Sequence, residues 1–165
     1  MNSQRPHYWL FLRLSDQTPG EWSFTLQPAD GSAPLYAADV EPEIERDRLE
    51  LLTLVRALEA LDQRSRVTLV GAGVELRRGL RFGLVEWRSL DWQVEVFGEL
   101  QPLPHADLWQ RVDHALTFHE IQQRVWRIDP PHVAPAAPHE NSMVAESAKE
   151  ARDAKRADRR RLVSA

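Results

Sequence analysis

The candidates for chemistry in this sequence are carboxylates and histidines, and its 165 residues include no cysteine that could form a disulfide or a thiolate metal site. Asp16 lies in a predicted turn, Glu50 near the start of a predicted helix, and His132 in a proline-rich stretch. Grouped carboxylates bind hard divalent cations such as Mg²⁺, whereas an isolated carboxylate has little reason to do so. Each of these residues also has an interpretation without chemistry. Asp16 would form a turn, His132 would be an exposed side chain, and Glu50 would cap a helix together with Asp47.

The first forty residues predict three antiparallel strands. Large apolar side chains over 8–14 predict a strand that is buried on both faces. After an Asp-Gln-Thr-Pro-Gly turn, Trp22, Phe24 and Leu26 alternate with polar residues, as in a half-buried strand. A weaker third strand follows over 34–40.

The middle of the chain alternates between helical spacing and short apolar runs. The predicted elements are a helix over 43–61, a strand over 67–70, helices over 71–92, an irregular connection over 93–104, a helix over 108–116 and a strand over 120–128. Asp107 is the predicted N-cap of the last helix. This order predicts an α/β domain whose mixed sheet contains a parallel pair.

The end of the sequence differs in composition. A loop rich in proline and alanine is predicted over 129–138, and the alanine-rich, charged segment 141–165 is helical by propensity. From Val144 onward this segment contains seven basic and four acidic residues. We expect one domain over 1–151 and a charged, frayed tail over 152–165.

Four short segments resemble segments of one known family. They are Asp47–Leu61, Asp107–Asp113 with the sequence DLWQRVD, His119–Ile121 and His139–Asn141. Together and in this order they resemble type 1 ribonuclease H over roughly 8–151. The resemblance implies the ribonuclease H-like fold, a mixed five-stranded sheet of three antiparallel strands followed by parallel strands, flanked by helices.

The same resemblance implies where metal ligands belong. In the family, four carboxylates hold two Mg²⁺ ions that cut the RNA strand of an RNA–DNA hybrid. Glu50 matches one of these carboxylates. Two further positions match Ala72 and Ala145, and neither alanine can bind a cation. The first carboxylate position is either Leu14 or Asp16, depending on how the first strand is aligned.

Neighbouring acids offer an alternative set of ligands. Glu75 follows Ala72 by three residues and Glu146 directly follows Ala145, but a one-turn shift along a helix moves a group by about 5 Å. The family also uses a mobile histidine in a glycine-rich loop. His132 lies in the corresponding loop here, where prolines replace the glycines.

Sequence evidence for nucleic-acid binding is weak. The segment 88–104, which corresponds to a basic protrusion in many family members, has one arginine against three carboxylates, and an acidic protrusion repels a duplex. The candidate nucleic-acid contacts are Arg77, Arg78, Arg159, Arg160 and Arg161. Such basic runs are weakly specific.

These observations favour a catalytically inactive, ribonuclease H-like pseudoenzyme that serves as a nucleic-acid-binding or scaffold module. One alternative is an active or weakly active hybrid endoribonuclease with a rearranged site built from Glu50, Asp16 and either Glu75 or Glu146. Another is a protein-interaction adaptor with no nucleic-acid role. No cofactor is expected for the inactive protein. Mg²⁺ or Mn²⁺ is expected only if the chain is the altered nuclease. The expected partners are an RNA–DNA hybrid, another nucleic acid or a protein, not a membrane, and the expected location is the cytoplasm.

Overall fold

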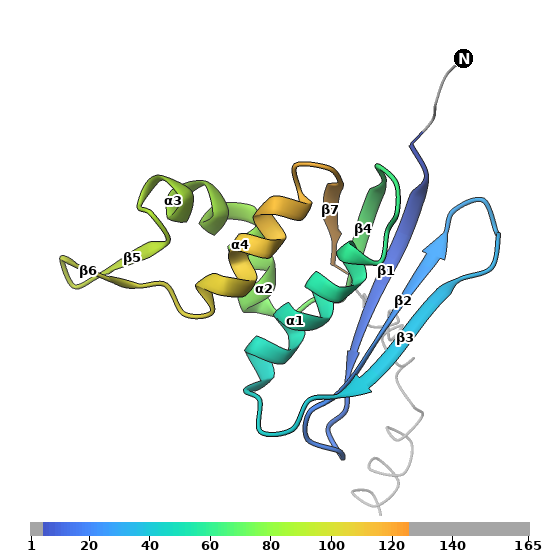
Figure 1. Ribbon diagram of the computed structural model, residues 1–165, viewed down its shortest axis with the longest axis horizontal. Coiled ribbons are helices and arrows are strands. Elements are labelled where there is room, and N and C mark those ends of the chain that lie inside the picture. Colours follow the sequence, from blue (N-terminus) through green and yellow to red (C-terminus); the bar gives the residue numbers. More distant parts are fainter. Residues whose placement is uncertain (1–4, 126–165) are drawn as a thin grey trace, which may run out of the picture. The chain divides into compact units, whose positions relative to one another are not determined.

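A five-stranded mixed sheet organises the protein in the computed structural model, which describes residues 5–125 (Figure 1). Its strands are β1 (His7–Leu14), β2 (Glu21–Pro28), β3 (Leu35–Val40), β4 (Arg66–Val70) and β7 (Glu120–Arg124), in the spatial order β3-β2-β1-β4-β7. Strands β1, β2 and β3 pair antiparallel, whereas β4 pairs parallel with both β1 and β7. The predicted α/β class and mixed sheet are confirmed.

The helices pack on one face of this sheet (Figure 1). They are α1 (Arg46–Glu59), α2 (Val74–Arg78), the π-helical turn η1 (Gly79–Gly83), α3 (Leu84–Ser89) and α4 (Ala106–Ala115). Helix α1 contacts β1, β2 and α4. Along the described part of the chain, no helix is long and apolar enough to cross a bilayer.

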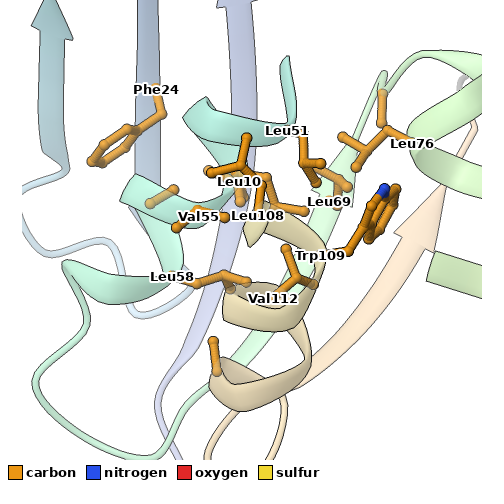
Figure 2. Close-up of a cluster of buried hydrophobic side chains, with 14 of the residues drawn as sticks. Leu10, Phe24, Leu51, Val55, Leu58, Leu69, Leu76, Leu108, Trp109 and Val112 are labelled. Atoms are coloured by element: carbon orange, nitrogen blue, oxygen red, sulfur yellow. The ribbon is translucent and has the colours of Figure 1, made fainter. Parts of the chain in front are cut away.

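The core lies between the sheet and helices α1 and α4 (Figure 2). Strand β2 contributes Trp22, Phe24 and Leu26, the alternating residues that the sequence predicts to be buried. Leu54 of α1 and Val112 of α4 are fully buried against them. Burial of such side chains stabilises a domain by about 1.5–3 kcal/mol each, so this contact positions α1, and Glu50 with it.

The prediction that the first strand is buried on both faces is wrong. Leu10 of β1 is fully buried, but the next residue, Phe11, points to the other face and is 41% exposed. The doubly buried strand is instead β4, where all residues of 67–70 are buried. Val67 and Leu69 point to one face of the sheet and Thr68 and Val70 to the other, so both faces of this strand are buried.

The predicted irregular connection over 93–104 contains a β-hairpin. Strand β5 (Gln93–Val96) pairs antiparallel with β6 (Glu99–Pro102), and Phe97 and Gly98 form the turn. The helix predicted to continue to Trp92 ends at Ser89. The sequence does not indicate the hairpin because its turn lacks the usual Asn-Gly or Asp-Gly pair.

Both predicted helix caps are wrong. Glu45 is the N-cap of α1 and His105 that of α4, and neither side chain makes a capping hydrogen bond. Asp107 instead lies inside the first turn of α4 and accepts hydrogen bonds of 2.9 and 2.7 Å from the Arg48 guanidinium. These bonds hold the pKa of Asp107 below its usual range and join α4 to α1.

Several predictions concern residues outside the described range. They include the loop 129–138, the helix and tail within 141–165, the domain boundary at 151, and the positions His132, Ala145, Glu146, Arg159, Arg160 and Arg161.

Candidate functional site

Ala72 lies where the central strand β4 leaves the sheet. The strand ends at Val70, and Gly71 turns the backbone with a positive φ of 73°. Ala72 then places its methyl group in the core cluster with 9% exposure. The position that the resemblance assigns to a metal-binding aspartate is therefore an almost buried apolar one.

The neighbouring strand has an arginine near the same end of the sheet. The parallel pairing of β1 with β4 ends at Phe11 beside Val70, and Arg13 of β1 and Ala72, just after β4, each lie two residues beyond this last pair. Arg13 is exposed, and a guanidinium cannot bind a metal cation. The register between strands cannot be read from the sequence, which offers Leu14 and Asp16 as candidates for the first carboxylate position.

Neither of those two candidates faces an open metal site. Leu14, the last residue of β1, packs against the hydrophobic core cluster. Asp16 lies in the turn after β1, is 85% exposed, and accepts a hydrogen bond of 2.8 Å from the Arg46 guanidinium at the start of α1. The structure thus gives Asp16 an ordinary surface ion pair.

Glu50 is half-buried and bonded to the backbone. Its Oε1 accepts a hydrogen bond of 2.7 Å from the N–H of Gly73, in the segment between β4 and α2. A Cβ atom at Gly73 would lie only 2.6 Å from Oε2 of the same carboxylate, so a side chain at this position would displace the Glu50 carboxylate. Glu50 therefore links α1 to the segment that contains Ala72.

A cavity of about 360 Å³ opens beside Glu50. Its polar lining includes Asp47, Glu50, Glu75 and His105, and its apolar lining is formed by Leu51, Leu76, Trp87, Leu103, Pro104 and Trp109. The indoles of Trp87 and Trp109 lie 5.0 Å apart, centroid to centroid, so they pack against each other. Asp16 is not among the lining residues, so the rearranged ligand set of Asp16 with Glu50 and Glu75 is not gathered at this cavity.

The described residues do not fit the two-metal site that the resemblance implies. Within residues 5–125, no group of three or more acidic or histidine side chains is arranged to hold a metal ion. Mg²⁺ requires oxygen ligands at about 2.0–2.1 Å in near-octahedral geometry. At the ends of the two central strands the chain offers Arg13 and Ala72 instead.

The predicted basic contacts lie on α2. Arg77 is half-buried, and its Nε donates to the Gly73 carbonyl at 3.4 Å. Arg78 is exposed. The protrusion is more acidic than its composition suggests, because its one arginine, Arg88, forms an ion pair with Asp113 of α4.

The comparisons with known proteins agree with this fold. No family model matches the chain. Proteins named Ribonuclease H from Afipia carboxidovorans and Nitrobacter hamburgensis are each 31% identical over 126 residues, which are 72% and 74% of this chain and 78% and 80% of those proteins. The chain belongs to the ribonuclease H family. The Ribonuclease H of Halorhodospira halophila is 35% identical over 103 residues, 62% of this chain and 66% of that protein.

Solved structures share the ribonuclease H fold at low sequence identity. The crystal structure of LC9-RNase H1, described as a type 1 RNase H with the type 2 active-site motif, is similar with a TM-score of 0.58 and 17% identity, over 80% of this chain and 68% of that one. A foamy viral protease-reverse transcriptase in complex with dsDNA has a TM-score of 0.53 and 15% identity, over 76% and 84%. The family fold is therefore present in this chain.

Proposed function

We propose that this chain is a non-catalytic member of the ribonuclease H family, retained as a binding or scaffold module. The observation that supports it most is the pair Arg13 and Ala72 at the ends of adjacent parallel strands. Catalysis by two metal ions requires carboxylates that converge on both ions. A guanidinium and a methyl group at this level remove two such ligands and add a positive charge that repels the cations.

The hydrogen bond of Glu50 supports the same proposal. Oε1 of Glu50 accepts the Gly73 N–H, which gives this carboxylate a structural role that needs no metal. This bond satisfies a half-buried backbone donor. Glu50 is thus explained as a structural acceptor that holds α1 to the segment after β4.

For the partner of this module, the charges favour a scaffold over a tight hybrid binder. The exposed carboxylates of the protrusion, Asp91, Glu95 and Glu99, oppose contacts to phosphates. Arg78 and the arginines at 159–161 are the groups from which nucleic-acid affinity would arise. If the module binds an RNA–DNA hybrid with an affinity that falls steeply as the salt concentration rises, its role is nucleic-acid binding. If it binds no hybrid at any salt concentration, its role is that of a protein adaptor.

A hybrid-cleavage assay tests the loss of catalysis. Highly purified protein is incubated with a labelled RNA–DNA hybrid and Mg²⁺ or Mn²⁺, with Glu50→Gln as the matched variant. We expect the same negligible cleavage from both proteins. Robust cleavage by the wild type that disappears in Glu50→Gln would refute the proposal.

One observation favours a second candidate, an altered metal-dependent nuclease. Asp47, Glu50 and Glu75 line the same cavity, so a modest rearrangement would bring their oxygens closer together. A crystal soaked in Mn²⁺ separates the two candidates. An anomalous peak coordinated by Glu50 and Glu75 supports the nuclease, and no peak in this cavity counts against it.

A further inference from the structure

The five-stranded sheet has a second face, opposite the one on which the helices pack (Figure 1). Side chains alternate between the two faces along a strand, so Phe11 of β1 and Tyr36 of β3 point away from the core. Phe11 is 41% exposed and Tyr36 is 63% exposed. Large apolar side chains gathered on one exposed face mark it as a candidate binding surface.

The strand register places these two rings in one row across the sheet. Thr25 of β2 pairs with both Tyr36 and Phe11, so its side chain lies between the two rings in this row. Neighbouring strands lie about 4.8 Å apart, so the Cα atoms of Tyr36 and Phe11 are about 10 Å apart. Beyond Phe11 the row continues through Val70, which is buried, to the exposed Arg124 of β7.

Two arginines flank the rings. Arg13 lies in the next row, two residues after Phe11 on β1, and is exposed. Arg124 is positioned by Trp9 of β1, because its guanidinium carbon lies 5.2 Å from the centroid of the Trp9 ring. We call Phe11, Arg13, Thr25, Tyr36 and Arg124 the sheet platform.

The charge of this face is positive around the platform. Within residues 5–125, neither Arg13 nor Arg124 forms an ion pair. The strands also present two acidic residues on this face, and both lie outside the rows that contain the platform. Glu120 is 3.7 Å from Arg66, which neutralises it, and Glu21 lies one row beyond Arg13. The face therefore keeps a net positive charge, although the whole chain carries −4.

The surface is hollowed beside the two rings. A cavity of about 730 Å³ is lined by Phe11, Arg13, Thr25 and Tyr36 together with neighbouring residues. Binding sites for small organic molecules have volumes of about 300–1,000 Å³, so a nucleobase with its sugar can enter this cavity. Thr25 supplies a hydroxyl group there, which both donates and accepts hydrogen bonds.

We propose that the sheet platform binds single-stranded RNA. Sites for single strands combine basic residues that contact phosphates with aromatic rings on which bases stack. Two bases stack on Phe11 and Tyr36, while phosphates pair with Arg13 and Arg124. Thr25 forms a hydrogen bond with a ribose 2′-hydroxyl between the two bases, and this group distinguishes RNA from DNA.

A duplex does not fit this arrangement. Bases inside a duplex are stacked on one another, whereas the unstacked bases of a single strand can lie on exposed rings. The platform also lies on the face of the sheet opposite the helices that line the cavity beside Glu50. RNA binding at the platform therefore does not depend on whether that cavity is catalytic, and the hybrid-cleavage assay and an RNA titration can fail separately.

Fluorescence anisotropy of a labelled oligouridine, titrated with the full chain, tests this proposal. We expect saturable binding that weakens as the salt concentration rises, with a slope of log K against log salt of about −1.4 for two phosphate contacts. Oligodeoxyuridine of the same length lacks only the 2′-hydroxyl. We expect it to bind the wild type more weakly than oligouridine does, and to match oligouridine in Thr25→Val.

Two variants at exposed positions test the rings and the arginines separately. Tyr36→Thr removes a ring and keeps a residue type favoured in strands, and we expect it to weaken binding at least about fivefold. Arg124→Gln removes one phosphate contact and should reduce the salt slope to about −0.7. Phe97→Asn removes an exposed ring from the β5–β6 hairpin, and Arg78→Gln removes an exposed charge from α2. Both are matched controls, and we expect them to leave the affinity unchanged.

Thermal unfolding shows that each variant is folded before its affinity is measured. No saturable binding by the wild type, tighter binding of a duplex than of the single strand, or equal affinities for RNA and DNA would overturn the proposal. Wild-type affinity in Tyr36→Thr or an unchanged salt slope in Arg124→Gln would do so too. Binding that is lost in Arg78→Gln but kept in Arg124→Gln would place the RNA on the helices and contradict the platform.

Discussion

Replacement of Glu50 by alanine distinguishes a structural acceptor from a metal ligand. The carboxylate accepts a charge-assisted bond of 2.7 Å from the Gly73 N–H, and such bonds contribute about 1.5–3 kcal/mol. Because Glu50 is half-buried and water reaches part of the site, we expect Glu50→Ala to lower the free energy of unfolding by about 1–2 kcal/mol. Glu50→Gln keeps an acceptor oxygen, and we expect a loss below about 1 kcal/mol.

If Glu50 were a metal ligand, Glu50→Ala would instead raise the free energy of unfolding of the metal-free protein. Where carboxylates converge without their metal, removal of one relieves repulsion between like charges and stabilises the fold. Urea unfolding followed by tryptophan fluorescence, in the absence of divalent cations, gives the free energies of unfolding. Asp62→Ala, at an exposed position that does not line the cavity, is the control and should change stability by only a few tenths of a kcal/mol. An unchanged or stabilised Glu50→Ala, or a Glu50→Gln that loses as much as Glu50→Ala, would refute the reasoning.

Three further predictions concern other positions. Gly79→Ala places a Cβ 2.3 Å from the buried indole of Trp109, and we expect a loss of about 1–3 kcal/mol in urea unfolding; a neutral result would mean that the ring can move. Burial lowers the pKa of His119 from its ordinary value near 6.5, so an unfolded chain takes up a proton there that the folded chain does not. The free energy of unfolding should therefore fall as the pH drops below about 6.5, with a shallower slope in His119→Gln; equal slopes would contradict this cause. Ala72→Asp buries a carboxylate, so its free energy of unfolding should fall by about 1–3 kcal/mol, and hybrid cleavage should not appear while Arg13 remains. Cleavage by that variant would show that Arg13 is no obstacle.

The sheet and its helices could be predicted because their signals are local. Trp22, Phe24 and Leu26 alternate along one strand, and an alternating strand has one buried face wherever it packs. The segment Asp107–Asp113 resembles a family helix, and the chain forms a helix there. Such patterns need no knowledge of which strands pair.

The site could be predicted only in part because its geometry depends on distant segments. Arg13 and Ala72 lie near the same end of the sheet because β1 pairs with β4, and these strands are separated by more than forty residues. The bond of Glu50 joins α1 to Gly73, which lies 23 residues further along the chain. The hairpin turn at Phe97 could not be predicted for a local reason: phenylalanine is unfavourable in the two-residue turn that it forms with Gly98.

Binding of Mn²⁺ to the full chain tests the loss of the metal site most directly. Titration followed by electron paramagnetic resonance of the free ion is carried out on the wild type and on Glu50→Gln. Because Arg13 and Ala72 replace ligands at the strand ends, we predict identical titrations with no saturable site that depends on Glu50. A saturable Mn²⁺ site in the wild type that disappears in Glu50→Gln would contradict a non-catalytic ribonuclease H fold.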